Sequence, residues 1–139
     1  MNRWDERFLG LAQYIATWSK DPSTQVGAVI ARPDRTVVSV GFNGLPRGAA
    51  DLPERLNDRD IKLALTIHAE ENAILFARGA AAGCSLYVSM RPCAKCAAII
   101  VQAGLAEVVA PAPTADRWKD SAELARRIML EAGLKVRLI

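Results

Sequence analysis

The sequence predicts an α/β fold, a three-layer α/β/α sandwich built on a mixed five-stranded sheet. Two β-branched runs joined by a tight turn lie early in the chain and predict an antiparallel hairpin. Strand and helix patterns then alternate to the C-terminus, which is typical of parallel strands joined by crossover helices. No repeat, charge block or long Gly/Pro/Ser linker interrupts this order, so we expect residues 1–139 to form a single domain.

The first elements are a helix and the hairpin. Residues 3–19 carry apolar side chains at helical spacing, which predicts an amphipathic helix whose apolar stripe enters the core. That stripe is Trp4, Phe8, Leu11, Ile15 and Trp18. Residues 25–31 and 36–42 are the two strands of the hairpin. The polar residues 43–60 follow, and we expect them to form a loop and the least structured stretch of the chain.

The second half contains the alternating elements. A helical pattern runs from about residue 68 to 78 and ends at Gly79. Pro92 stands where a helix-starting proline is common, so the next helix covers 93–103. The remaining elements are strands at 85–90, 105–110 and 135–138 and a helix at 121–132.

Composition limits the chemistry, because 139 residues contain only three cysteines and one histidine. No apolar run approaches the roughly 20 residues that cross a bilayer, and the first ten residues are too charged for a signal peptide. We therefore expect a soluble, cytoplasmic protein with reduced thiols and no membrane partner. The net charge of +3 permits a small anionic ligand but is too weak to indicate nucleic-acid binding.

His68, Cys93 and Cys96 form a candidate metal site. Each lies at the start of a predicted helix, and successive helices of this layout begin at the same edge of the sheet. A helix N-terminus favours the thiolate form of cysteine, and two thiolates with one imidazole suit zinc, leaving a fourth position for water. Glu70 follows the histidine by two residues and is the candidate catalytic acid–base.

Other interpretations of these residues remain open. The Cys-x-x-Cys pair could be a redox pair or half of a structural zinc ribbon. Cys84 could complete a closed Cys3His site with no catalytic role. A closed site gives no reason for Glu70 or Pro92, and Cys84 opens the strand that runs toward Pro92. We therefore expect Cys84 to be a small buried apolar residue.

The chain resembles the zinc-dependent cytidine and deoxycytidylate deaminase superfamily over almost its whole length. His68-Ala69-Glu70 and the Pro92-Cys93-x-x-Cys96 segment match the superfamily. Three further segments point to its nucleotide monophosphate branch, the deoxycytidylate deaminases; they are residues 19–28 (SKDPSTQVGA), 41–48 (GFNGLPRG) and 99–104 (IIVQAG).

The resemblance implies a cytidine deaminase-like fold, one Zn²⁺ per chain and hydrolysis of dCMP to dUMP and ammonia. Water activated by the zinc would attack C4 of cytosine. Glu70 would protonate N3 and then pass a proton to the departing ammonia. The Arg91 backbone carbonyl would face the cytosine amino group, and the Ala69 amide would meet the pyrimidine O2. Asn43 would contact the sugar, although Asn-Gly is also a common turn dipeptide.

The phosphate and the outer face of the nucleotide have less specific candidates. A 5′-phosphate needs cations or helix-end amides. Trp118 could cover the nucleotide or cap the core. The candidate phosphate-binding residues are Lys20, Arg47, Arg117 and Lys119, although each of them taken alone is more typical of a solvated surface charge.

The resemblance leaves regulation and assembly open. Some relatives carry a second, structural zinc before the catalytic histidine, but residues 44–67 here contain no histidine or cysteine. The resemblance also suggests dCTP and dTTP as candidate effectors and a homo-oligomer, either hexamer or dimer. Rival functions are deamination of a 5-substituted cytosine nucleotide, of a free nucleoside or of adenosine in tRNA, and a structural zinc module without activity.

Overall fold

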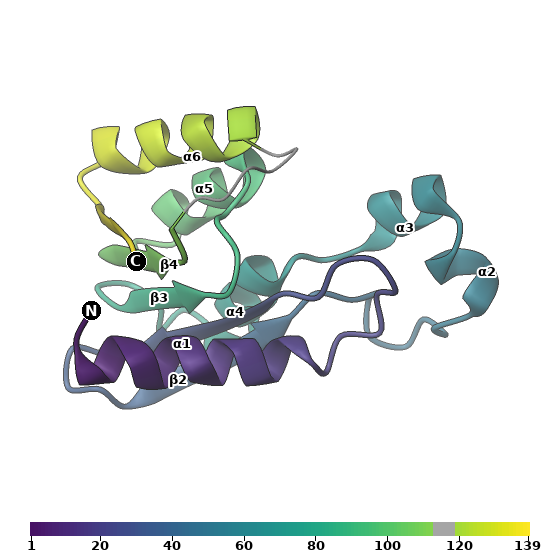
Figure 1. The fold of residues 1–139 in the computed structure, drawn as a ribbon, viewed down its shortest axis with the longest axis horizontal. Helices are drawn as coiled ribbons and strands as arrows, with labels where there is room; N and C mark the ends of the chain where they lie inside the picture. The colour runs from purple at the N-terminus through teal and green to yellow at the C-terminus, as the bar shows by residue number, and fades with distance from the viewer. Residues whose placement is uncertain (113–118) are drawn as a thin grey trace.

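One mixed sheet of five strands forms the centre of the protein (Figure 1). A computed structural model describes residues 1–112 and 119–139 of the chain. The strand order is β2-β1-β3-β4-β5. β1 pairs antiparallel with β2 and β3, whereas β3, β4 and β5 run parallel, so the expected mixed α/β sheet is confirmed. The strands are β1 (Gly27–Ala31), β2 (Val37–Phe42), β3 (Ser85–Val88), β4 (Glu107–Ala110) and β5 (Lys135–Leu138).

Helices cover both faces of the sheet and make the three expected layers. Helix α1 (Arg3–Ala16) lies on one face, where Phe8 packs with Val29 and Tyr87. The other face packs against α4 (Ala69–Ala77), α5 (Ala94–Gln102) and α6 (Lys119–Glu131). Successive residues of a strand point to opposite faces, so each central strand contributes to both cores.

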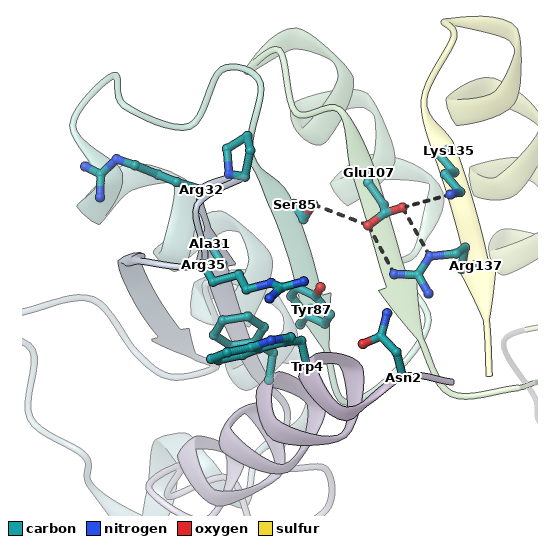
Figure 2. Close-up of a pocket in the computed structure, with 12 residues that line it drawn as sticks. Asn2, Trp4, Ala31, Arg32, Arg35, Ser85, Tyr87, Glu107, Lys135 and Arg137 are labelled. Carbon is teal, nitrogen blue, oxygen red and sulfur yellow. Dashed lines mark hydrogen bonds and ion pairs between the residues drawn. The ribbon is translucent and has the colours of Figure 1, made fainter.

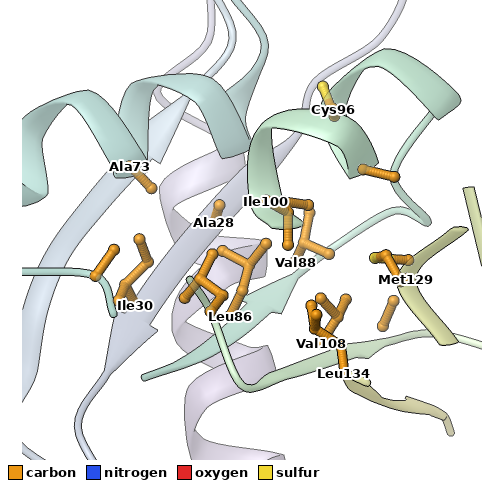
Figure 3. Packing of buried hydrophobic residues seen from close by; sticks show 14 of the residues in the cluster. Ala28, Ile30, Ala73, Leu86, Val88, Cys96, Ile100, Val108, Met129 and Leu134 are labelled. Atoms are coloured by element: carbon orange, nitrogen blue, oxygen red, sulfur yellow. The ribbon is translucent and has the colours of Figure 1, made fainter. Parts of the chain in front are cut away.

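The larger core lies between the sheet and the three-helix layer (Figure 3). Ile30, Leu86 and Val88 of the sheet meet Ile100 of α5 and Met129 of α6 there. Each of these side chains is fully buried, and burying one contributes about 1.5–3 kcal/mol. This packing fixes α4 and α5 on the sheet, so it also fixes the two helix N-termini that begin the candidate site.

The stretch 43–60 is not the continuous loop that the polar sequence indicates. The short helix α2 (Pro53–Leu56) forms within it, and α3 (Arg59–Leu65) begins at its end; both project from the body of the protein (Figure 1). Pro53 begins the first, and the Asp58 carboxylate caps the second by accepting from the Ile61 amide at 3.1 Å. Neither helix has a buried residue, so no apolar stripe reveals them in the sequence.

The core prediction for Trp18 is wrong. Phe8 and Ile15 are buried as expected, but α1 ends at Ala16 and Trp18 lies beyond it with 47% of its surface exposed. The helical period stops before the last residue of the stripe. Trp18 therefore packs edge-on against Phe42, with ring centroids 6.1 Å apart, instead of entering the core.

Gly41 allows α4 to approach β2 closely. A Cβ atom at this position would clash with the Ala69 carbonyl oxygen and lie 2.5 Å from the Ala73 nitrogen, both in the backbone of α4. The absence of a side chain therefore sets the depth at which the first turn of α4 sits. Among the described residues, no helix is both long and apolar enough to cross a membrane.

Candidate metal centre and active site

Three side chains from two helix N-termini converge at one end of the sheet. His68 is the N-cap residue of α4, and Cys93 is the N-cap residue of α5. The His68 Nδ1 atom lies 3.1 Å from the Cys96 Sγ and 3.7 Å from the Cys93 Sγ. All three donor atoms lie within 4.8 Å of one another. The structure therefore brings together the three residues that the sequence indicated as ligands.

This donor set fits zinc. Tetrahedral zinc with the usual Zn–N and Zn–S bond lengths places its N and S donors about 3.5–3.8 Å apart. The two Nδ1–Sγ separations, 3.1 and 3.7 Å, lie close to that range, and one side of the cluster faces a pocket. Cys84 does not belong to the cluster: it is buried, and its thiol lies 3.4 Å from the Ala80 carbonyl oxygen. The described residues therefore form an open, three-ligand site and not a closed Cys3His site.

The pKa values of the two thiols move in opposite directions because the thiols face each other. A hydrogen bond from Cys96 lowers the pKa of the Cys93 thiol to about 3, and a further one from His68 acts in the same direction. That same bond to Cys93, together with burial, raises the pKa of the Cys96 thiol. The bond to Cys93 raises the pKa of His68. A divalent cation would displace the protons of these groups, because it binds thiolates and neutral imidazole.

Glu70 lies beside the three ligands at the second position of α4. Its side chain is buried, with 4% of the residue exposed. Burial raises the pKa of the Glu70 carboxyl from 4.5 to about 7. A carboxyl group with such a pKa can both accept and release a proton near neutral pH. Since it is held by the same helix turn as His68, this carboxyl group is positioned next to the candidate metal centre.

The cluster opens into a pocket of about 840 Å³. Its walls come from the 21–26 turn, from α3, from the first turn of α4 and from the segment after β3. Pro111 and Ala112, which follow the end of β4, also line it. A cavity of this size can enclose a small molecule as large as a nucleotide. The carboxyl end of β4 and the helix N-termini meet here, as at the ligand-binding edge of other α/β sheets.

Asn43, Ala69 and Arg91, three of the expected substrate contacts, line this pocket. The Asn43 side chain also holds the neighbouring backbone in place. Its oxygen accepts a hydrogen bond from the Val26 backbone N–H, and its nitrogen donates one to the Thr24 carbonyl, both at 2.8 Å. This residue therefore shapes the 24–26 wall whether or not it touches a sugar. The Arg91 guanidinium donates to Glu123 at 3.2 Å.

The expected phosphate ligands lie elsewhere where the structure describes them. Neither Lys20, Arg47 nor Lys119 is among the residues that line the pocket. Lys20 is largely exposed and pairs with Asp51 at 3.1 Å. The Arg47 guanidinium lies over the Phe76 ring, 5.3 Å from its centroid. Arg117 and Trp118 fall outside the described residues.

Sequence reasoning missed two cations on α3 that do line the pocket. Arg59 and Lys62 are three residues apart and therefore project from one side of this short helix. The Lys62 ammonium donates to the Asp21 carboxylate and to the Ser23 hydroxyl, each at 3.1 Å. The capping Asp58 followed by this i, i+3 pair was the available signal. The predicted loop 43–60 covers only the start of this helix, and the sequence pattern predicts no element for residues 61–67.

Comparisons with known proteins agree with this geometry. Residues 2–112 match the family model described as the cytidine and deoxycytidylate deaminase zinc-binding region. An uncharacterized deaminase in the luxG 3′ region of Aliivibrio fischeri is 45% identical, with 98% of this chain and 93% of that protein covered. Deoxycytidylate deaminase of Mus musculus is 42% identical, with 96% and 78% covered.

A solved structure shows the same fold. The dCMP deaminase of cyanophage S-TIM5, in complex with dCMP and dUMP, superposes with a TM-score of 0.77 at 22% identity and covers 100% of this chain and 99% of that one. With the metal ligands assembled and most of the chain matched, the chain belongs to the cytidine and deoxycytidylate deaminase family of zinc-binding proteins.

Proposed function

We propose that this protein catalyses the hydrolytic deamination of dCMP to dUMP and ammonia. The observation that carries the proposal is the buried Glu70 carboxyl beside an open His68, Cys93 and Cys96 metal centre, at one end of a nucleotide-sized pocket. Relatives named deoxycytidylate deaminase are 40–42% identical over 96% of the chain, which favours dCMP among the possible substrates.

Four side chains at one end of the pocket have distinct roles in the proposed mechanism. His68, Cys93 and Cys96 would hold zinc, which when bound would supply the Lewis acidity that makes water a nucleophile at neutral pH. Glu70 accepts a proton from the attacking water, delivers one to N3 of the cytosine ring and then carries one to the leaving amino group. A carboxyl with a pKa near 7 suits this exchange because neither protonation state is strongly favoured.

Backbone groups beside the ligands orient the base. The Ala69 amide, in the first turn of α4, is proposed to donate to the pyrimidine O2, and the Arg91 carbonyl to accept from the amino group. Both residues line the pocket. A carbonyl acceptor favours an amino group over the carbonyl of the uracil product, so these contacts favour cytosine.

Arg59 and Lys62 are the proposed phosphate contacts. Both line the pocket from α3, and the described part of the chain provides no carboxylate partner for Arg59. The Lys62 ammonium has three N–H donors and uses two of them in hydrogen bonds to the 21–23 turn, which leaves one for a phosphate oxygen. We expect Arg59→Gln to raise the KM for dCMP while leaving turnover of deoxycytidine unchanged.

Ammonia release from a substrate panel tests the proposal. The panel is dCMP, CMP, deoxycytidine and 5-methyl-dCMP, assayed with the zinc-loaded protein. We expect dCMP to have the highest kcat/KM. Deoxycytidine turnover at the dCMP rate would overturn the phosphate requirement, and a higher kcat/KM for 5-methyl-dCMP would favour the rival substrate, a 5-substituted cytosine nucleotide. Absence of any turnover at full zinc loading would favour a structural zinc module.

The proposal extends to the oligomeric state of the protein, its nucleotide effectors and its cellular location. We infer that residues 1–139 act as one catalytic domain in a homo-oligomer, because α4 exposes the apolar Leu75 and Phe76. The family resemblance suggests dCTP and dTTP as effectors, and the unpaired, metal-binding thiols fit the reducing cytoplasm. Light scattering after gel filtration tests assembly, and repeating the panel with 0 or excess dCTP and dTTP tests regulation.

A further inference from the structure

A second pocket lies at the opposite end of the sheet from the metal centre (Figure 2). It has a volume of about 320 Å³. The catalytic pocket follows the carboxyl ends of β3 and β4, whereas this one is formed where Ser85, Glu107 and Lys135 begin β3, β4 and β5. The start of α1 and the β1–β2 turn close its other sides. A ligand here would therefore occupy a site separate from the substrate.

The floor of this pocket is a fixed ion-pair network. Arg137 donates to both carboxylate oxygens of Asp5 at 2.8 Å and to both of Glu107 at 3.1 and 3.2 Å. Lys135 lies 3.8 Å from Glu107. The negative charge of the two carboxylates is thus already compensated, and Arg137 is held in one orientation by bidentate bonds.

The facing wall presents donors that lack an anionic partner. The Arg35 guanidinium lies 4.9 Å from the centroid of the Trp4 ring and points toward Tyr87 (Figure 2). No carboxylate of the described residues pairs with Arg35. The Asn2 side-chain oxygen caps α1 by accepting from the Asp5 amide, which leaves its NH₂ group as a donor at the pocket.

Charge decides which ligand suits this site. Arg137 is taken up by Asp5 and Glu107, and the Arg32 guanidinium bonds to the Thr36 hydroxyl and extends away from the cavity. Arg35 and Lys135 are therefore the cations that face it, and together with Arg137 they exceed the two carboxylates by one positive charge. Guanidinium groups match the oxygens of phosphate in a bidentate geometry, and stacking on Trp4 orders Arg35 before any ligand arrives. We propose that this pocket binds a phosphate group, either as the free ion or as the monoester of a small molecule.

Titration of the zinc-loaded protein at constant ionic strength tests the proposal. Inorganic phosphate and glycerol 3-phosphate form two arms, which distinguish the free ion from a monoester. The readout is the indole N–H resonance of Trp4, assigned with Trp4→Phe, because it reports this pocket and not the catalytic one. We expect saturable binding of at least one probe.

Variants identify the cations responsible. Arg35→Gln and Lys135→Gln should each weaken binding by about tenfold, as expected for the loss of a charge-assisted hydrogen bond. The matched control is Arg126→Gln, which removes an exposed arginine of α6 and should leave binding unchanged. All three should deaminate dCMP at the parental rate, so a failure of this site is separable from a failure of the proposed function. Shifts that stay linear in probe concentration, or that Arg126→Gln weakens equally, would overturn the proposal.

Discussion

The buried pair between Asp5 and Arg137 makes a quantitative prediction about stability. Asp5 is only 1% exposed, and hydrogen bonding to Arg137 lowers the pKa of its carboxyl from 3.8 to about 2. A carboxyl whose pKa is lower in the folded state stabilises the fold at pH values above its unfolded pKa. That contribution is lost as the pH falls through the folded pKa.

The size of the effect follows from these two pKa values. Their difference corresponds to about 2.5 kcal/mol of unfolding free energy at pH 7. We therefore expect Asp5→Asn to be less stable than the parent by about 2 kcal/mol at pH 7. The difference between the two proteins should fall by roughly half at pH 3 and continue to shrink toward pH 2.

Urea denaturation of both proteins at pH 7, 5, 4 and 3 measures this difference. Loss of zinc in acid destabilises both proteins, so it cancels in the comparison. Glu6→Gln is the matched control, since Glu6 is an exposed acidic residue of the same helix turn and its loss should cost less than about 0.5 kcal/mol. A gap as large at pH 3 as at pH 7, or no gap at pH 7, would refute the reasoning.

Three further experiments test how the fold supports the site. Asn43→Ala removes two hydrogen bonds from the 24–26 wall, so it should lower the free energy of unfolding in urea by about 1–3 kcal/mol. It should also raise the KM for dCMP, and an unchanged KM would contradict this expectation. Gly41→Ala should destabilise the fold in thermal melts and reduce bound zinc, because its Cβ would clash with the backbone of α4. The control is Gly10→Ala, whose Cβ meets nothing within 4 Å; it should leave the stability unchanged or raise it by up to about 1 kcal/mol. The costs of Lys62→Met and Asp21→Asn should be less than additive in a double-mutant cycle, and strict additivity would mean that the pair is not coupled.

Local patterns predicted the elements that carry the metal site. His68 and Cys93 each precede a helix that its own neighbours specify, and the sheet brings those two helix starts together. Cys96 follows one turn later on the same face, so three ligands could be named without knowing any long-range contact. Short-range signals were sufficient because helix N-termini are defined by adjacent residues.

Other features depend on partners that are distant in sequence. Asp5 looks like an ordinary acidic residue of a first helical turn, yet it pairs with Arg137 across 132 positions. The cations of α3 were missed because that helix buries no side chain and so lacks the apolar period that reveals a helix. Charge alone could not distinguish Lys20, which faces solvent, from Lys62, which faces the pocket.

Replacing Glu70 with glutamine tests the central claim most directly, because Gln has nearly the same shape but cannot carry the proton. Zinc content and dCMP turnover are measured on the same preparation of Glu70→Gln and parent. We predict one zinc per chain in both, and turnover reduced by at least about a hundredfold in the variant. A variant that keeps parental turnover, or that loses turnover only in proportion to lost zinc, would contradict the assignment of Glu70 as the proton carrier.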